Sequence, residues 1–226
     1  MRTIINADDF GFSEKTNIAI VECFKNGIIN SATLMANMPG TKQAIEFTKQ
    51  YNLSIGIHFN LNDGTPMNKD ILDIKELSDG KKFEFKINRH SFLLKKKIID
   101  NIYKEFKFQI EFLLSHGVNI THIDSHHHIH TILPIFLITR KIAKEYKLTV
   151  RIPRTSGGNK FIKKSYKRFI HKIMKKDKIS FSDYFINYDE YINDKKINNN
   201  TEIMVHPIIS NNKVICSTTN IFLCEL

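Results

Sequence analysis

Hydrophobic and polar residues along the chain follow two periods, one typical of β-strands and the other of α-helices. Short apolar runs rich in β-branched residues predict strands at residues 2–9, 31–36, 53–60, 121–130, 148–152, 184–188 and 201–207. Apolar residues at helical spacing predict helices after Ser13, after Gly40, at residues 95–116, after Pro134 and at residues 160–178. This alternation of strands and helices predicts a parallel sheet or barrel.

The helix predicted at residues 95–116 has the clearest pattern, and Gly117 supplies its stop signal. Its apolar face consists of Ile98, Ile102, Phe106, Ile110 and Leu113. Residues 160–178 predict a basic amphipathic helix, whose apolar side consists of Ile162, Tyr166, Phe169, Ile170 and Ile173. We interpret the basic helix as an ordinary outer helix, with binding to a membrane or an anionic ligand as the alternative.

Two stretches of the chain are long and weakly patterned. Residues 62–90 carry turn signals at Asp63-Gly64, Thr65-Pro66 and Asp79-Gly80, and so long a loop is typical of a lid or a binding loop. Residues 155–200 include a loop that opens at Ser156-Gly157-Gly158 and a polar loop predicted at residues 187–200. We predict one domain over residues 1–226 with insertions near 62–90 and 155–200. Residues 214–226 support no structural prediction.

Composition describes an ordinary globular protein. The 226 residues and the 42% hydrophobic content suit one domain with a substantial core. The sequence contains no apolar run of about 18 residues, so it predicts no membrane span. The N-terminus has no apolar signal segment, so we expect a cytoplasmic protein. Cys23, Cys216 and Cys224 are widely spaced and are predicted to be free thiols rather than a disulfide framework.

The net charge of +11 would suit nucleic acid or an anionic membrane as a partner. The lysines, however, are spread through isoleucine- and asparagine-rich sequence instead of forming a patch. We interpret them as a solvated surface and expect no specific nucleic-acid partner. The oligomeric state is not fixed by the sequence, and a homo-oligomer is an open alternative.

Ionisable side chains stand at the ends of five predicted strands, at Asp8 and Asp9, His58, His126 and its neighbours, Arg151, and His206. The carboxyl ends of parallel strands gather at one rim, so we expect these side chains to form one site. Adjacent aspartates inside a strand would point to opposite faces, but at a strand end both can approach one ion or one water.

Residues 121–130, Thr-His-Ile-Asp-Ser-His-His-His-Ile-His, hold five of the chain's ten histidines. A lone histidine is usually a core residue, but this density favours metal binding or catalysis. Imidazoles and carboxylates are ligands of divalent cations. The residues alone do not choose among His126, His127 and His128. In a strand-like segment His126 and His128 would share a face, so His128 is a competing ligand.

The sequence resembles the YdjC-like carbohydrate deacetylases, the family that contains chito-oligosaccharide deacetylase. The shared motifs, in family order, are Asn6-Ala7-Asp8-Asp9-Phe10-Gly11, Gly56-Ile57-His58-Phe59-Asn60-Leu61, residues 121–130, Val150-Arg151-Ile152 and Met204-Val205-His206-Pro207. The resemblance implies an α/β fold, an irregular (β/α) barrel of the glycoside hydrolase/deacetylase type with about six or seven parallel strands. The chain departs from the family at residues 214–226, where members usually carry a further helical tail.

The resemblance also implies roles for individual residues. Asp9, His58 and His126 would bind one divalent metal ion, which is magnesium in the family, although the ligand set also suits zinc. Asp8 would be the general base. We choose His206 as the candidate general acid, because expelling an amine requires a proton donor, and we expect Arg151 to orient Asp8 or bind substrate.

Four further residues are expected to support the ligands or to touch substrate: His122, Asp124, His128 and His130. His122, Asp124 and His130 would steady the tautomers of the ligand imidazoles through hydrogen bonds. The alternative role for Asp124 is to contact the substrate.

The reaction that the resemblance implies is metal-dependent removal of the N-acetyl group from a 2-acetamido sugar or chito-oligosaccharide, with release of acetate. One alternative is a phosphoesterase on the same scaffold. Another is an inactive basic protein that binds an anionic polymer or a membrane through residues 160–178. A glycosidase is less favoured, because we find no well-placed second acid for a carboxylate pair.

Overall fold

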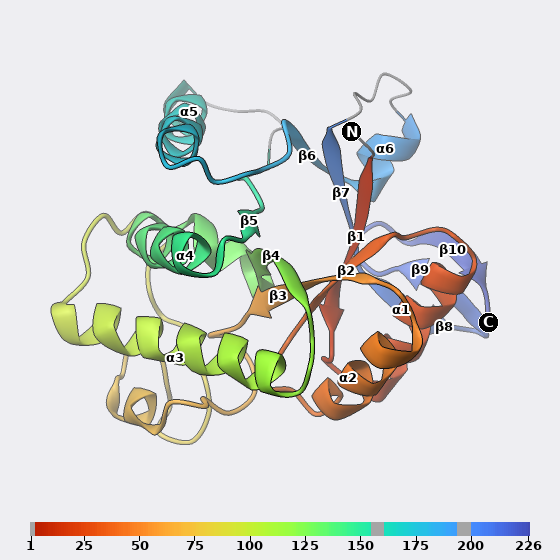
Figure 1. Cartoon of the computed structure of the whole chain (residues 1–226), viewed down its shortest axis with the longest axis horizontal. Coiled ribbons are helices and arrows are strands. Elements are labelled where there is room, and N and C mark those ends of the chain that lie inside the picture. Colours follow the sequence, from red (N-terminus) through yellow and green to blue (C-terminus); the bar gives the residue numbers. More distant parts are fainter. Residues whose placement is uncertain (1–2, 155–160, 194–199) are drawn as a thin grey trace.

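Seven parallel strands form one sheet that curls into a half-barrel (Figure 1). The structure, a computed structural model, describes residues 3–154, 161–193 and 200–226. The strands are β1 (Ile4–Phe10), β2 (Ser31–Leu34), β3 (Ser54–Phe59), β4 (Ile120–Ser125), β5 (Thr149–Val150), β6 (Tyr184–Asn187) and β7 (Thr201–Val205). Their order is β5-β4-β3-β2-β1-β7-β6, and every pair is parallel. The predicted α/β class and irregular barrel are confirmed.

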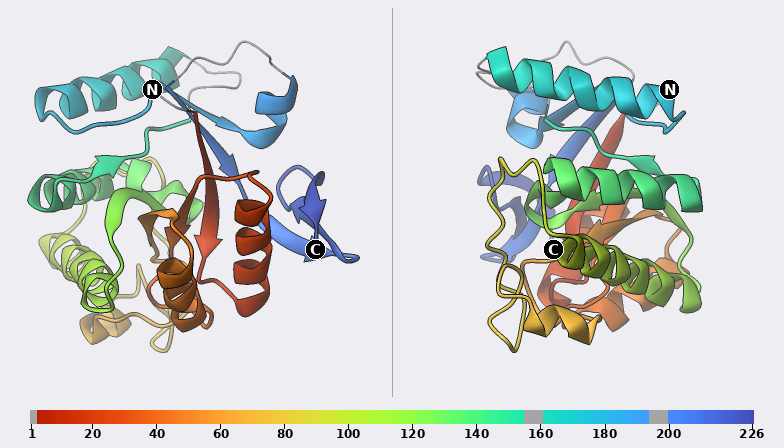
Figure 2. Two further views of the ribbon diagram at one scale, coloured as in Figure 1. Left: turned by 45° about the vertical axis from the view of Figure 1, so that its right-hand side comes forward. Right: turned by 90° about the vertical axis from the view of Figure 1, so that its left-hand side faces the viewer.

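Helices alternate with the strands and cover the outside of the sheet (Figure 2). They are α1 (Glu14–Lys25), α2 (Thr41–Gln50), α3 (Lys96–Ser115), α4 (Leu133–Tyr146), α5 (Phe161–Lys176) and α6 (Tyr188–Asn193). The predicted apolar face of α3 is buried, and Phe106 on it stacks on Phe59 of β3 with ring centroids 4.0 Å apart. Burial of each such side chain contributes roughly 1.5–3 kcal/mol, so packing fixes α3 against the sheet.

The last residues of the chain form a second sheet that the sequence did not predict. It consists of β8 (Pro207–Ser210), β9 (Lys213–Cys216) and β10 (Ile221–Glu225), all antiparallel, and it packs against α1. Asn211 and Asn212, with φ of 49° and 57°, make the two-residue turn between β8 and β9. Asparagine tolerates this left-handed backbone, so the Asn-Asn pair was an available hairpin signal.

Residues 62–90, which are weakly patterned in sequence, are packed against the rest of the domain. They contain a short 3-10 helix, η1 (Lys69–Asp73), and place Ile71, Leu77 and Phe83 in the core. Buried Glu105 of α3 accepts hydrogen bonds from the backbone N–H groups of Met67 (3.2 Å) and Asn68 (2.6 Å). These contacts join the stretch to α3.

The stretch 155–200 contains β6, which belongs to the main sheet. The predicted Ser156-Gly157-Gly158 loop lies outside the described residues. The loop predicted at residues 187–200 is wrong for residues 188–193, which form α6. The backbone N–H of Asn187 donates to Glu190 Oε2 (2.9 Å), half of a capping box that starts this short helix.

The basic helix predicted at residues 160–178 is α5, from Phe161 to Lys176. Ile170 and Met174 are buried, whereas Phe169 is exposed. The Tyr166 hydroxyl donates to the Thr131 carbonyl (2.6 Å). One face of α5 is therefore packed on the domain. Among the described residues, every helix is too short or too polar to span a bilayer.

Candidate active site

A bulge in β1 brings two adjacent carboxylates to the same rim of the half-barrel. The pairing of β1 with β2 runs Ala7 to Ala32 and then Phe10 to Leu34, so β1 contains one extra residue. Asp9 has φ of 66°, a left-handed backbone that is uncommon for a residue with a side chain. The bulge breaks the strand alternation that would send Asp8 and Asp9 to opposite faces.

Asp9, His58 and His126 converge at this rim, as the sequence predicts. Asp9 Oδ1 is 3.2 Å from His58 Nε2 and 2.8 Å from His126 Nδ1. One ligand atom from each residue lies within 4.8 Å of the others. Two imidazoles and one carboxylate at this spacing fit a divalent cation and leave coordination positions for water and substrate. The donor set and its geometry therefore suit the implied metal ion.

The histidine run departs from the predicted strand after Ser125. Residues His126–Thr131 form a 3-10 turn, η2, in which His127 and His128 have φ of 52° and 55°. The expectation that His126 and His128 share a strand face is therefore wrong, because the backbone turns between them. His126 points to Asp9, whereas the His128 ring packs edge-on against Phe185 at 5.7 Å. Consecutive left-handed residues are typical of functional sites.

Each imidazole of the cluster has a second carboxylate on its other nitrogen. His58 Nδ1 is 2.6 Å from Asp124 Oδ1, its neighbour across the β3–β4 pair. His126 Nε2 is 3.1 Å from Asp63 Oδ2. Such carboxylates fix the tautomer and raise the basicity of a metal-binding imidazole. Asp124 lies beside the imidazole of one predicted ligand, and Asp63 lies in the matching place beside the other.

Asp63 was not predicted as a site residue, because the Asp63-Gly64 pair was interpreted only as a turn. Its side chain is 42% exposed, but its backbone is held. The Asp63 carbonyl accepts from the side-chain amides of Asn60 (2.7 Å) and Asn37 (3.1 Å), and its N–H donates to Asn60 Oδ1 (3.1 Å). These amides hold the carboxylate next to His126.

Arg151 lies at the centre of a buried ionic network. Its Nη1 and Nη2 bind both oxygens of Asp8 at 2.6 and 2.7 Å, and Nη1 also binds Asp124 Oδ2 at 2.6 Å. Its Nε donates to Glu202 Oε1 of β7 at 2.6 Å. The paired contacts with Asp8 fix the plane of its carboxylate. Glu202 was not singled out in the sequence, because it is one polar residue inside an apolar strand.

Burial and charge together set the protonation of these groups. Burial alone raises the pKa of Asp8 and Asp124, but the Arg151 guanidinium and the His58 imidazolium together outweigh burial and hold both pKa values below their usual range. Burial alone lowers the pKa of His58, but the carboxylates of Asp124 and Asp9 raise it to about 10. At neutral pH the metal-free site therefore holds a protonated His58 between carboxylates.

His206 follows β7 and faces Asp8, with Nε2 3.9 Å from Asp8 Oδ2. Its Nδ1 is buried and has no hydrogen-bond partner among the described residues. His130 lies behind the rim, where its Nδ1 is 2.6 Å from Ser125 Oγ. Burial lowers the pKa of His128 to about 4 and that of His130 to about 3, so both rings are neutral.

The structure does not bring His122 to the rim. Its ring nitrogens lie near Thr121 Oγ1 (2.8 Å), Ser31 Oγ (3.3 Å) and Asn6 Oδ1 (3.2 Å), toward the N-terminal ends of the strands. A Cβ on Gly56 would lie 2.6 Å from this ring, so the glycine of the Gly-Ile-His motif makes room for His122. An alternating strand sends His122 and Asp124 to the same face but at different depths.

Comparisons with known proteins identify relatives over most of the chain. A model of the YdjC-like protein family matches residues 2–221. A carbohydrate deacetylase of Clostridium beijerinckii is 35% identical over 221 residues, covering 97% of this chain and 86% of the relative. A carbohydrate deacetylase of Brevibacillus brevis is 39% identical over 158 residues, covering 70% of this chain and 61% of the relative. The chain thus aligns with most of the first relative and with less than two thirds of the second.

A solved structure from Enterococcus faecalis, described by a suggested role in cellobiose-phosphate cleavage, is similar in fold. Its TM-score is 0.70 at 23% identity, and the match covers 93% of this chain and 82% of that one. This likeness supports the half-barrel architecture alone.

Proposed function

The chain belongs to the YdjC-like protein family, and we propose that it is a metal-dependent carbohydrate N-deacetylase. Its substrate would be a 2-acetamido sugar or chito-oligosaccharide, and its products acetate and the free amino sugar. The observation that carries the proposal is the convergence of Asp9, His58 and His126 within 4.8 Å at the carboxyl rim. Relatives named carbohydrate deacetylase, at 35% and 39% identity, support the substrate class.

Asp9, His58 and His126 would hold one divalent cation. A cation there supplies Lewis acidity, which polarises the acetamide carbonyl and lowers the pKa of a nearby water toward about 7. The family resemblance favours magnesium, and the two imidazoles also suit zinc. Asp124 and Asp63 would orient the two imidazoles through the nitrogens that face away from Asp9.

Asp8 would accept a proton from the attacking water. Its Oδ1 already accepts from Asn6 Nδ2 and Arg151 Nη2, whereas its Oδ2 accepts from Arg151 Nη1 and also faces His206. Each carboxylate oxygen has two lone pairs, so Oδ2 keeps one for the transferred proton. Arg151 fixes the carboxylate plane through its paired contacts.

His206 would donate a proton to the departing amine. Its Nε2 lies 3.9 Å from Asp8 Oδ2, so the proton acceptor and the proton donor border the same point of the rim. Its Nδ1 has no hydrogen-bond partner among the described residues, so no hydrogen bond to that atom fixes the tautomer of the ring. This pairing supports acyl transfer to water.

The test is acetate release from a panel of acetylated sugars, including N,N′-diacetylchitobiose, with and without a chelator and added ions. We expect acetate only when a divalent ion is present. Phosphate esters assayed in parallel distinguish the phosphoesterase alternative. Release of phosphate without acetate, or retention of full activity after complete metal removal, contradicts the proposal.

A further inference from the structure

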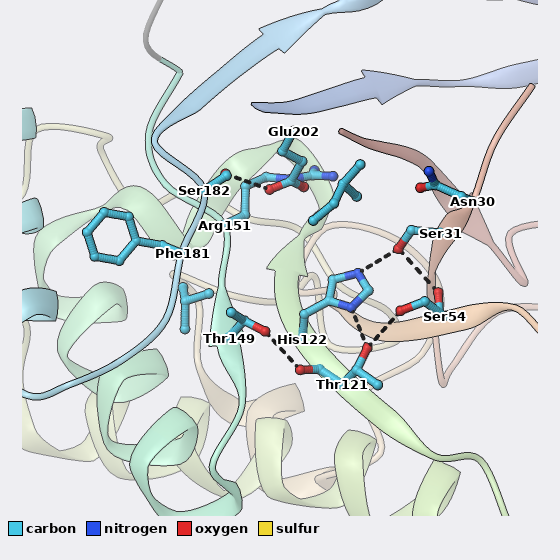
Figure 3. A pocket seen from close by; sticks show the side chains of 12 residues that line it. Asn30, Ser31, Ser54, Thr121, His122, Thr149, Arg151, Phe181, Ser182 and Glu202 are labelled. Atoms are coloured by element: carbon cyan, nitrogen blue, oxygen red, sulfur yellow. Dashed lines mark hydrogen bonds and ion pairs between the residues drawn. The ribbon is translucent and has the colours of Figure 1, made fainter. Parts of the chain in front are cut away.

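A cavity of about 220 Å³ opens at the N-terminal ends of the strands, opposite the candidate active site (Figure 3). Ile4, Ser31 and Ser54 at its border are residues at the start of β1, β2 and β3. Arg151 and Glu202 lie on its inner side, between this cavity and Asp8. The rim chemistry described above does not use the cavity.

One side of the cavity is a hydroxyl wall, formed by Ser31, Ser54 and Thr121 around His122 (Figure 3). Two contacts of the serine hydroxyls in this wall are long: Ser31 Oγ lies 3.2 Å from the Ser54 carbonyl oxygen, and Ser54 Oγ lies 3.2 Å from Thr121 Oγ1. Hydroxyl hydrogen bonds usually measure about 2.7–2.8 Å. Burial lowers the pKa of His122 to about 4, so the ring is neutral. The wall can therefore exchange hydrogen bonds with a neutral polyhydroxyl group.

The inner side of the cavity carries a buried carboxylate with spare acceptor capacity. Glu202 is only 6% exposed, and its Oε1 binds Arg151 Nε at 2.6 Å. Its Oε2 faces Ser182 Oγ at 3.4 Å, which is long for a hydroxyl–carboxylate bond. Arg151 also binds Asp8 and Asp124, so one guanidinium is shared among three carboxylates. Glu202 therefore shares its counter-ion with two other carboxylates, and its Oε2 can accept from a cationic donor in the cavity.

Phe181 also borders the cavity, but its ring points away from the hydroxyl wall in Figure 3 and packs against His171 of α5, with ring centroids 5.3 Å apart. A primary ammonium group offers three donors to a carboxylate and hydroxyls. We propose that the cavity is a second binding site, for a small hydroxylated primary amine of the amino-sugar class, with its ammonium group on Glu202 and its hydroxyls on the hydroxyl wall.

Two short chains of contacts join this site to Asp8. One runs from Glu202 through Arg151. The other runs from His122 Nε2 to Asn6 Oδ1 (3.2 Å), and from Asn6 Nδ2 to Asp8 Oδ1 (2.9 Å). An ammonium group on Glu202 weakens that residue's hold on Arg151, so occupancy lowers kcat without excluding substrate. The choice of an amino sugar as the ligand rests on the proposed function, because a deacetylase releases that class of compound. The site itself is inferred from the cavity alone.

The test is calorimetric titration of the metal-loaded full chain with D-glucosamine and with D-glucose. Ser54→Leu places an apolar side chain at the cavity mouth, and Ser115→Leu, at the exposed end of α3, is the matched control. We expect Ser54→Leu to weaken glucosamine binding at this site roughly tenfold, because leucine removes a hydroxyl partner of the ligand's hydroxyls and fills part of the cavity mouth. Its basal rate of acetate release should equal that of the native chain and of the control.

Glu202→Gln tests the charge, since glutamine keeps the shape of the side chain. The native chain should prefer glucosamine to glucose, and Glu202→Gln should lose that preference. Equal binding of the two sugars by the native chain, or identical titrations for the native chain, Ser54→Leu and Ser115→Leu, overturns the inference. If the protein releases acetate but shows no such binding, the second site is rejected and the proposed function stands. If it binds glucosamine as described but releases no acetate from any acetylated sugar, the second site stands and the proposed deacetylase function is rejected.

Discussion

Binding of a divalent ion to the site should expel a proton from His58. The ring lies between Asp124 Oδ1 (2.6 Å from Nδ1) and Asp9 Oδ1 (3.2 Å from Nε2), and these carboxylates raise its pKa to about 10 against the depressing effect of burial. A cation needs the lone pair of Nε2, which carries a proton in the metal-free site. Metal and proton therefore compete, and metal affinity should rise with pH.

The size of the effect follows from the pKa. At pH 7 a group of pKa about 10 is almost fully protonated, so apparent metal affinity is roughly a thousandfold below its limit at high pH and changes about tenfold per pH unit. About one proton should leave His58 per ion bound. Asp124→Asn removes the nearest negative charge and moves the pKa toward the ordinary value near 6.5, so that only about a quarter of a proton leaves at pH 7.

Calorimetric titration with Mg²⁺ and Zn²⁺, in buffers of different ionisation enthalpy, measures this proton release directly. Asp79→Asn, in an exposed turn, is the control that changes the net charge equally. Metal affinity independent of pH between 6 and 8 refutes the reasoning. So does proton release that Asp124→Asn leaves unchanged.

Three substitutions test the other roles. Asp8→Asn should keep the native metal affinity and lower kcat by roughly 10²–10⁴-fold, because it removes the proton acceptor; normal turnover would show that the base is another group. His206→Ala should bind metal and lose rate chiefly on poor leaving amines, and an equal loss on acetanilides and acetamido sugars argues against its role as acid. Asp63→Asn should weaken metal binding, by roughly tenfold, through its effect on His126, and chelator competition measures the change.

The sequence was sufficient to predict the layout of the rim. The strand-ending positions of Asp8, Asp9 and His58 are local facts, and parallel topology brings such ends together. The choice of His126 over His128 required the family resemblance. Its physical reason is a pair of left-handed residues, His127 and His128, which redirect the chain after Ser125. Residue periodicity carries no signal for such a turn.

Long-range contacts could not be predicted in the same way. Glu202 meets Arg151 across 51 positions, and Asp63 meets His126 only because two asparagine amides hold its turn. His122 belongs to the same histidine run as His126, yet its position near the start of β4 carries it toward the opposite mouth of the half-barrel. The depth of a side chain within a barrel depends on strand register, which the pattern of residues does not fix.

The central claim is that Asp9, His58 and His126 hold one ion that the chain uses to deacetylate a sugar. The most direct measurement is the rate of acetate release from N,N′-diacetylchitobiose by chelator-treated protein as a divalent ion is added back. The account predicts no activity at the start and a rise that saturates when one equivalent per chain is bound, with His58→Ala inactive throughout. Full activity without bound metal, or one tightly bound equivalent with no acetate from any acetylated sugar, contradicts it.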